Sequence, residues 1–353
     1  MELVEIIQNA LGSKNVSSAS DIHLVYGLPP KMRRDGKLDA LEGAPALDDA
    51  QCIKFAKELA GDQWGEVENG GELDLARTYG QVRIRGNLFW QQGHISSAIR
   101  LLSDNIPALE ALGLPSVVST FPDFKRGVVL VTGVTGSGKS TTLASILQRI
   151  NETRYDHIVT LEDPIEYIYH PPRCVINQRE INRDTDSYAS GLKAVLREDP
   201  DVILIGEMRD LETIQIALTA AETGHLVFAT LHTASAPDSV DRIVEVFPTG
   251  MQKQIRMQLS QTLQAVLSQQ LLPRAGGIGR VCACEVMVVN HAIRNLIREG
   301  KTPQIANALA TSADEGGITM DNAILRLLAS RVITPETALR AARDPELLSK
   351  SFV

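Results

Sequence analysis

The chain has 353 residues, 44% hydrophobic and 22% charged, which is long enough for about two globular domains of roughly 150 residues each. Its net charge of −8 argues against a general nucleic-acid surface, so we expect no nucleic-acid partner and disfavour a translocase. The start, MELVEIIQNALG, lacks the basic region of a signal peptide, and no run approaches about 18 apolar residues, so we expect membrane contact only through partners.

The first part of the chain mixes helical and antiparallel-strand patterns. Apolar residues share one helical face over residues 3–11, ASDIHLVYG predicts a strand, and Asp35-Gly36 predicts a tight hairpin turn. A helix is expected at about 47–60. These patterns predict a small α+β domain over residues 1–112.

The stretch YGQVRIRGNLFWQQG reads as a strand of this first domain. Val82, Ile84 and Leu88 fall on one face of the strand by alternation. Arg83 and Arg85 fall on the other, which makes that face basic.

A proline-containing segment, residues 113–126, shows no clear period and is expected to be a linker. From residue 127 to 353 the apolar runs GVVLVTG, HIVTLED, DVILIGE and HLVFATLHT alternate with helical patterns. Continuous apolar strands separated by helices predict a parallel sheet covered on both faces, hence an α/β second domain. Past about residue 250 we expect mostly helix, including one long helix through MQKQIRMQLSQTLQAVLSQQLL.

The four cysteines, Cys52, Cys174, Cys282 and Cys284, lack the spacing of a zinc ribbon. In the run VCACEVMVV, Cys282 and Cys284 are expected to be small buried side chains of a strand. So few cysteines fit a reducing cytoplasm.

The sequence GVTGSGKST, residues 133–141, matches the phosphate-binding pattern G-x-x-x-x-G-K-[ST] and stands between a predicted strand and a predicted helix. In such a loop, backbone N–H groups and the helix N-terminus face phosphate oxygens. Lys139 is expected to reach the β- and γ-phosphates and Ser140 to ligate Mg²⁺, so we predict ATP and Mg²⁺ as ligands. The predicted binding residues in this loop are Thr135, Gly136, Ser137, Gly138, Lys139, Ser140 and Thr141.

Acidic and histidine side chains follow or flank three other predicted strands. Glu207 follows DVILI and is expected to hold Mg²⁺ or the attacking water, since ligands bind at the carboxyl ends of parallel strands. Glu162 and Glu166 in VTLEDPIEY are alternative general bases for that water. His225 and His232 bracket the last strand, and His232 is placed to sense the γ-phosphate.

Transition-state charge on a transferred phosphoryl group commonly draws an arginine. Arg83, Arg85 and Arg100 of the first domain are the candidates, and we expect them to come from a neighbouring subunit of a ring.

Together GVTGSGKST, VTLEDPIEY, LREDPDVILIGEMRDLETI and TGHLVFATLHT resemble the Walker A, Asp box, atypical Walker B and His box of the secretion ATPases. ASDIHL, GLPPKMRRDGKL, AIRNLIREGK and GGITMDNAI are similar to the branch of that family that retracts type IV pili. The resemblance covers nearly the whole chain.

The resemblance implies a homohexamer of PAS-like N-terminal and RecA-like C-terminal domains, with ATP between them. It implies that Glu207 is the Walker B acid, that Glu162 or Glu166 orients water, and that His225 and His232 link nucleotide state to domain rotation. It implies that Ala292–Lys301 serves retraction more than hydrolysis. It places the hexamer in the cytoplasm, peripheral at the inner face of the cytoplasmic membrane, beside a PilC-like platform protein and the pilus machinery.

Two alternatives remain open at this level. One is an accessory retraction motor of the PilU type, and the other is a nucleotide-gated scaffold with little turnover. The presence of Glu166, Glu207 and His232 together favours a motor over a scaffold.

Overall fold

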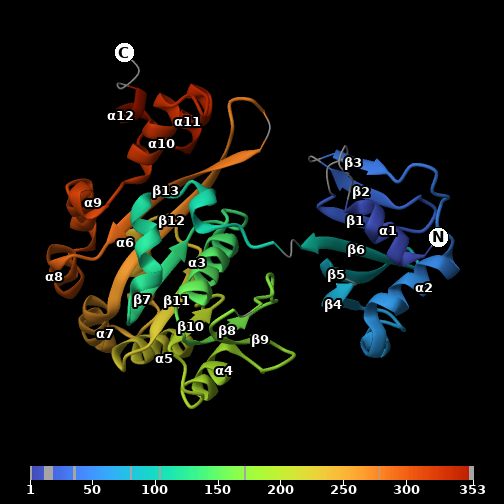
Figure 1. Ribbon diagram of the computed structural model, residues 1–353, viewed down its shortest axis with the longest axis horizontal. Helices are drawn as coiled ribbons and strands as arrows, with labels where there is room; N and C mark the ends of the chain where they lie inside the picture. The colour runs from blue at the N-terminus through green and yellow to red at the C-terminus, as the bar shows by residue number, and fades with distance from the viewer. Residues whose placement is uncertain are drawn as a thin grey trace. The chain divides into compact units, whose positions relative to one another are not determined.

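The computed structural model (Figure 1) describes residues 2–11, 19–34, 37–79, 82–102, 105–170, 172–277 and 279–349. They form two compact units, one of residues 1–105 with 166–168 and one of residues 106–165 with 169–353. The boundary therefore falls at 105/106, ahead of the one predicted after residue 112.

In the described residues, the first unit has a six-stranded antiparallel sheet with strand order β3-β2-β1-β6-β5-β4, together with two α-helices and a 3-10 helix. The predicted turn at Asp35-Gly36 lies outside the described residues. The elements are α1 (Leu3–Ala10), β1 (Asp21–Leu24), β2 (Lys31–Arg34), β3 (Lys37–Ala40), α2 (Asp49–Ala60), η1 (Gly61–Glu66), β4 (Glu72–Tyr79), β5 (Val82–Gln91) and β6 (His94–Leu102).

Local sequence explains where α2 begins. The Asp48 carboxylate accepts a hydrogen bond from Gln51 N at 2.8 Å, and the Gln51 side chain accepts one from Asp48 N at 3.0 Å. This reciprocal cap satisfies two donors that a helix start leaves unpaired. The helix then buries Phe55, Ala56 and Leu59 in the core of the unit.

The second unit is a seven-stranded sheet with strand order β13-β12-β7-β11-β10-β8-β9. Only β13 runs antiparallel to its neighbour, so the predicted parallel sheet is confirmed. The elements up to α6 are η2 (Leu109–Leu112), η3 (Ser116–Asp123), β7 (Gly127–Thr132), α3 (Lys139–Thr153), β8 (His157–Glu162), β9 (Val175–Glu180), α4 (Tyr188–Val195), β10 (Val202–Ile205), α5 (Leu211–Glu222), β11 (Leu226–Leu231) and α6 (Ala236–Glu245).

Every residue of β7, β10 and β11 is buried, as expected of central strands covered on both faces. Val128 and Leu130 of β7 belong to the main core cluster with residues of α5. Val129 and Val131 point to the opposite face by alternation and are also buried.

The C-terminal part of the unit is less helical than predicted. It comprises α7 (Thr249–Thr262), β12 (Leu263–Pro273), β13 (Arg280–Val288), α8 (His291–Glu299), η4 (Thr302–Gln304), α9 (Ile305–Ala310), η5 (Ala313–Glu315), α10 (Met320–Ala329), α11 (Pro335–Ala341) and α12 (Pro345–Ser349). The long helix predicted from residue 251 is therefore wrong after Thr262, where the chain enters β12 between β7 and β13. Cys284 is buried in β13, as predicted, whereas Cys282 is only half-buried, which differs from the prediction.

The segment 113–126 is not a free linker. Within it, η3 buries Val118, Phe121 and Pro122. The guanidinium of Arg154, at the end of α3, donates to Pro122 O at 2.8 Å and to Phe124 O at 3.0 Å. Ser145 of α3 likewise donates to Pro107 O at 2.7 Å. These contacts make residues 106–126 part of the second unit.

Within the described ranges, no helix is both long and apolar enough to span a bilayer.

Candidate functional site

The loop between β7 and α3 has the backbone that its glycines permit. Gly133, Gly136 and Gly138 have φ of +139°, +78° and +95°. At Gly133 an added Cβ would lie 2.5 Å from Gln269 O and 2.6 Å from Ser137 Oγ. The loop can take this path only with glycine at position 133.

The functional side chains of this loop lie where the motif predicts. Lys139 is the first residue of α3, and its Nζ donates to Gly133 O at 2.8 Å and to Val134 O at 3.2 Å. The Lys139 ammonium therefore lies against the backbone carbonyls of the loop. Ser140 is exposed in the first turn of α3 and Thr141 is half-buried.

The hydroxyl of Ser137 is buried inside the loop and has no hydrogen-bond partner among the described residues. Thr135 and Gly136 are exposed at its tip. A buried polar group without a partner is costly, so the loop provides a donor for an incoming polar ligand. A lysine ammonium, a hydroxyl donor and a helix N-terminus suit an anion such as a phosphate.

Glu207 lies at the carboxyl end of β10 beside an arginine and a histidine. Its Oε2 is 2.6 Å from Arg209 Nη2, and its Oε1 is 3.2 Å from His232 Nε2. Burial raises the pKa of Glu207, but the hydrogen bond from Arg209 and the charge of His232 lower it more, so the net pKa is below the usual glutamate value. The carboxylate is ionised at neutral pH.

Sheet order places these groups together. The loop follows β7, His232 follows the neighbouring β11, and Glu207 follows β10, the next strand. With strands about 4.8 Å apart, Glu207 stems from a position about 10 Å across the sheet from the loop. The prediction that His232 and Glu207 share the edge occupied by the loop is confirmed.

Arg209 is a component that sequence reasoning missed. The Arg209 side chain is 72% exposed and forms an ion pair with Glu207. The ion pair points to the site because the Glu207 side chain is largely buried. The only local signal was a cation two residues after the predicted acid.

The two glutamates of VTLEDPIEY lie in different parts of the structure. Glu162 ends β8, where its Oε1 accepts hydrogen bonds from Thr160 Oγ1 at 2.6 Å and from Gln178 Nε2 at 3.2 Å. It lies at the same sheet edge as Glu207, one strand further from the loop. Glu166 belongs to the short segment 166–168 that groups with the first unit, so its role toward water stays a prediction.

His225 lies where predicted, at the opposite end of the last strand from His232, and its link to domain rotation stays a prediction. It precedes β11, and β11 pairs with β7 so that Leu226 faces Gly127 and Leu231 faces Thr132. His225 therefore lies at the start of these parallel strands, about 20 Å from the loop at roughly 3.3 Å per residue. There its Nδ1 is 2.9 Å from Ala220 O, near the end of α5, which is a structural contact.

The three candidate arginines differ within the first unit. Arg85 of β5 faces Arg100 of β6 in register, and both line a hollow of about 170 Å³. Arg100 Nε donates to Asp21 Oδ1 at 2.9 Å. Arg83 is only 7% exposed, whereas Arg85 on the same strand face is exposed. Whether these residues reach a phosphate stays a prediction.

The stretch Ala292–Lys301 forms most of α8 and its C-terminal cap. Arg294 donates to Ser260 O at 2.8 Å and Gln261 O at 3.1 Å, both at the end of α7, and to Gln264 Oε1 at 3.1 Å. Burial lowers the pKa of this arginine. Part of the stretch therefore joins α8 to α7.

An α/β sheet with this loop and an ionised acid two strands away defines a nucleotide-binding ATPase fold. Comparison with known proteins identifies the family: residues 2–334 match the model of type II/IV secretion system proteins, and the chain belongs to that family.

The chain is most informatively compared with three proteins. It is 44% identical over 348 residues to the type IV pilus retraction ATPase PilT of Pseudomonas aeruginosa, covering 98% of this chain and 99% of the relative. It is 36% identical over 335 residues to the type IV pilus ATPase PilU of the same organism, covering 94% and 88%. A crystal structure of the pilus retraction motor PilT with bound ADP superposes with a TM-score of 0.92 at 45% identity, covering 99% of both chains. The family resemblance read from the motifs is confirmed.

Proposed function

We propose that this chain is a motor ATPase that hydrolyses ATP to retract type IV pili. The observation that carries the proposal is the geometry of the loop 133–141, with the ionised Glu207 at the same edge of the sheet. The likeness to PilT over nearly the full length of both chains supports the same conclusion.

In the proposed reaction the loop binds the triphosphate through backbone N–H groups and the Lys139 ammonium. Ser140 and Glu207 fit Mg²⁺, since a hydroxyl and a carboxylate are the oxygen donors it prefers, and the ion would neutralise charge on the phosphates. Glu207, kept ionised by Arg209 and His232, accepts hydrogen bonds from water near the phosphate. His232, in contact with Glu207, registers loss of the γ-phosphate.

Which glutamate orients the attacking water is part of the proposal. Glu162 and Glu166 are both candidates. Glu162 shares the sheet edge with Glu207, which supports it, although its Oε1 already accepts two hydrogen bonds.

The proposed assembly is a homohexamer in which the first unit is a PAS-like domain and the second a RecA-like domain. Arg83, Arg85 and Arg100 would approach the phosphates from a neighbouring subunit. The ring would work in the cytoplasm, at the inner face of the membrane, against a platform protein of the pilus machinery. Ala292–Lys301 would serve retraction more than hydrolysis.

The accessory-motor alternative is weaker, because identity is 36% to PilU and 44% to PilT over similar lengths of this chain. Genetic complementation tests the choice. In a strain lacking its own retraction motors, this chain is expected to restore twitching by itself, and Lys139→Ala is expected not to. Restoration only alongside a second retraction ATPase would identify the accessory motor. Restoration by Lys139→Ala would contradict an ATP-driven role.

A further inference from the structure

A buried carboxylate outside all the motifs lies in the same row of the sheet as the nucleotide loop. Glu285 of β13 faces Ser268 of β12, which in turn faces Thr132, the last residue of β7. Thr132 also faces Leu231, the residue before His232. The side chain of Glu285 is only 2% exposed. Register therefore places this charge at the edge where the loop and His232 lie.

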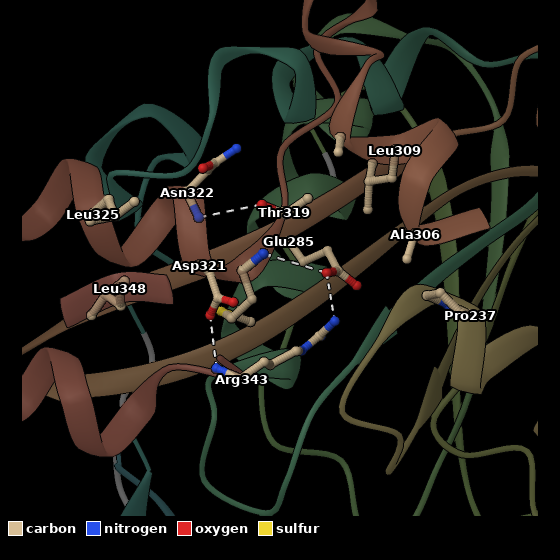
Figure 2. A pocket seen from close by; sticks show the side chains of 12 residues that line it. Pro237, Glu285, Ala306, Leu309, Thr319, Asp321, Asn322, Leu325, Arg343 and Leu348 are labelled. Atoms are coloured by element: carbon tan, nitrogen blue, oxygen red, sulfur yellow. Dashed lines mark hydrogen bonds and ion pairs between the residues drawn. The ribbon is translucent and has the colours of Figure 1, made fainter. Parts of the chain in front are cut away.

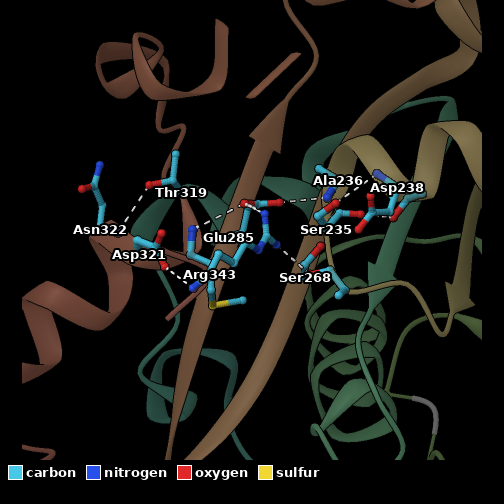
Figure 3. A network of polar contacts seen from close by, with 12 residues as sticks. Ser235, Ala236, Asp238, Ser268, Glu285, Thr319, Asp321, Asn322 and Arg343 are labelled. Atoms are coloured by element: carbon cyan, nitrogen blue, oxygen red, sulfur yellow. Dashed lines mark hydrogen bonds and ion pairs between the residues drawn. The ribbon is translucent and has the colours of Figure 1, made fainter. Parts of the chain in front are cut away.

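Both carboxylate oxygens of Glu285 accept hydrogen bonds, and the donors come from three places in the sequence (Figure 3). Its Oε1 accepts a hydrogen bond from Ala236 N at 2.8 Å, at the start of α6. Its Oε2 accepts from Arg343 Nη1 at 2.8 Å and from Met320 N at 3.4 Å, at the start of α10. One buried carboxylate thus joins α6, α10 and the segment before α12.

Arg343 divides its guanidinium between that carboxylate and the segment after His232. Its Nη2 donates to Ala234 O at 2.7 Å. Its own backbone is fixed by Asp321, whose Oδ1 accepts from Arg343 N at 2.8 Å (Figure 2). Glu285, Asp321 and Arg343 line a cavity of about 330 Å³ between α6 and the C-terminal helices. Arg343 is thus a bridge from the C-terminal helices to Ala234.

The segment from His232 to Ala236 is held at successive positions. Thr233 Oγ1 is 2.6 Å from Ser239 Oγ, Arg343 binds the carbonyl of Ala234, and Glu285 binds the N–H of Ala236. At the start of the segment, His232 Nε2 lies 3.2 Å from Glu207. The direction of the His232 side chain depends on the path of this segment.

We propose that Glu285 and Arg343, which we call the Glu285–Arg343 clamp, are positioning residues that hold His232 against Glu207. The proposal rests on the proposed function, since His232 acts there on the nucleotide site. It makes the C-terminal helices α10–α12 part of the device that sets the position of His232. Helix capping alone would need only an acceptor for Ala236 N, whereas the clamp also needs the planar, two-sided donor of an arginine.

Two conservative substitutions weaken the clamp in different ways. Arg343→Lys keeps the charge but replaces a planar fork by a single ammonium, which cannot hold both Glu285 and Ala234 in the same geometry. Glu285→Gln keeps an acceptor for Ala236 N but removes the charge that Arg343 pairs with. Arg340→Lys is the matched control, because Arg340 is an arginine of α11 whose side chain is 80% exposed. Thermal unfolding of each full-length variant checks that it is folded.

The kinetic test asks whether Arg343 acts through His232. Misplacing a functional group by about 1 Å can cost roughly a hundredfold in rate. We expect Arg343→Lys and Glu285→Gln to lower kcat for ATP by about ten- to a hundredfold with ATP affinity kept, and Arg340→Lys to match the wild type. In a His232→Ala background, Arg343→Lys is expected to cause no further loss. An equal loss in both backgrounds would overturn the proposal.

A second readout does not depend on turnover. The imidazole NMR signals of His232, assigned by their disappearance in His232→Ala, are expected to move in Arg343→Lys and to stay in place in Arg340→Lys. Unmoved signals in Arg343→Lys would overturn the clamp. A wild-type chain that binds ATP without releasing phosphate would instead refute the proposed function, and the NMR comparison would still decide the clamp.

Discussion

Replacing Gly133 by alanine perturbs the nucleotide loop at its most constrained point. The residue has φ of +139°, and the new methyl would overlap Gln269 O and Ser137 Oγ at 2.5 and 2.6 Å. Neither atom can yield easily, because Gln269 belongs to β12, which is paired on both sides, and Ser137 is buried. The loop itself must therefore move, and its N–H groups leave their positions toward the phosphates.

Two costs set the size of the effect. A backbone conformation that only glycine adopts readily costs about 1–3 kcal/mol in another residue. A methyl group forced into a packed site costs about 1–3 kcal/mol more. The sum of about 2–6 kcal/mol corresponds to a loss of roughly 30-fold or more in ATP affinity, if the strain is relieved by giving up the binding conformation.

Titration with a fluorescent ATP analogue measures this loss, and thermal unfolding shows whether the fold survives. Gly224→Ala is the matched control. Gly224 also has a positive φ, +119°, but an added Cβ meets no described atom within 4 Å, and the residue lies at the opposite edge of the sheet. This control is expected to lower Tm slightly and to keep ATP affinity. Wild-type affinity in Gly133→Ala would refute the reasoning.

Three further substitutions test other parts of the structure. Arg294→Ala is expected to lower the free energy of unfolding by about 2–4 kcal/mol, because three acceptors lose a charged donor. Calorimetry should show a lower Tm for Arg294→Ala than for the control Arg298→Ala, which changes an exposed arginine of the same helix. Equal Tm values in the two variants would contradict this expectation. Arg209→Ala removes a cation that lowers the pKa of Glu207. Since the folded pKa is depressed, the ionised group contributes stability above the unfolded pKa of about 4.3 and loses it as pH falls through the folded pKa. The Tm difference between wild type and Arg209→Ala should therefore narrow as pH drops below about 5, and a widening difference would be inconsistent with this ion pair. Asp48→Ala removes the cap of α2 and is expected to lower the free energy of unfolding, measured with denaturant, by about 1 kcal/mol. An unchanged free energy of unfolding would show that the cap does not stabilise the fold.

The central strands and the nucleotide loop were predictable because their signals are local. Val202–Ile205 is a continuous apolar run, and such runs suit strands buried on both faces. The loop needs only its glycines, Lys139 and the strand and helix around it. Glu207 and His232 could be placed at one edge because parallel strands share their carboxyl ends.

The end of α7 was not predictable from spacing. Leu263, Val266 and Leu267 continue the apolar stripe of Ile255 and Leu259, so helical periodicity extends past the true end of the helix. The strand is decided by pairing, because β12 fills the position between β7 and β13. Tertiary pairing overrides the local pattern here.

Long-range partners account for the remaining differences. No sequence pattern near Glu285 indicates that Arg343 is its partner. The carboxylate lies at the same edge as His232 because of the register of β13 with β12 and of β12 with β7. His225 could be placed before the last strand from the sequence, and the pairing of β11 with β7 puts it at the end of the strand away from the loop. The strand, and the end of that strand, at which a side chain lies determine whether it can reach the site. Its distance from the motifs in the sequence matters less.

Magnesium-dependent release of phosphate from ATP by the purified full-length chain tests the central claim most directly. The account predicts steady release by the wild type and a fall of at least about a hundredfold in Glu207→Gln, with ATP still bound. Glu212→Gln, an exposed acid paired with Lys193, should keep wild-type turnover. Release that is absent in the wild type, or equally fast in Glu207→Gln, would contradict it.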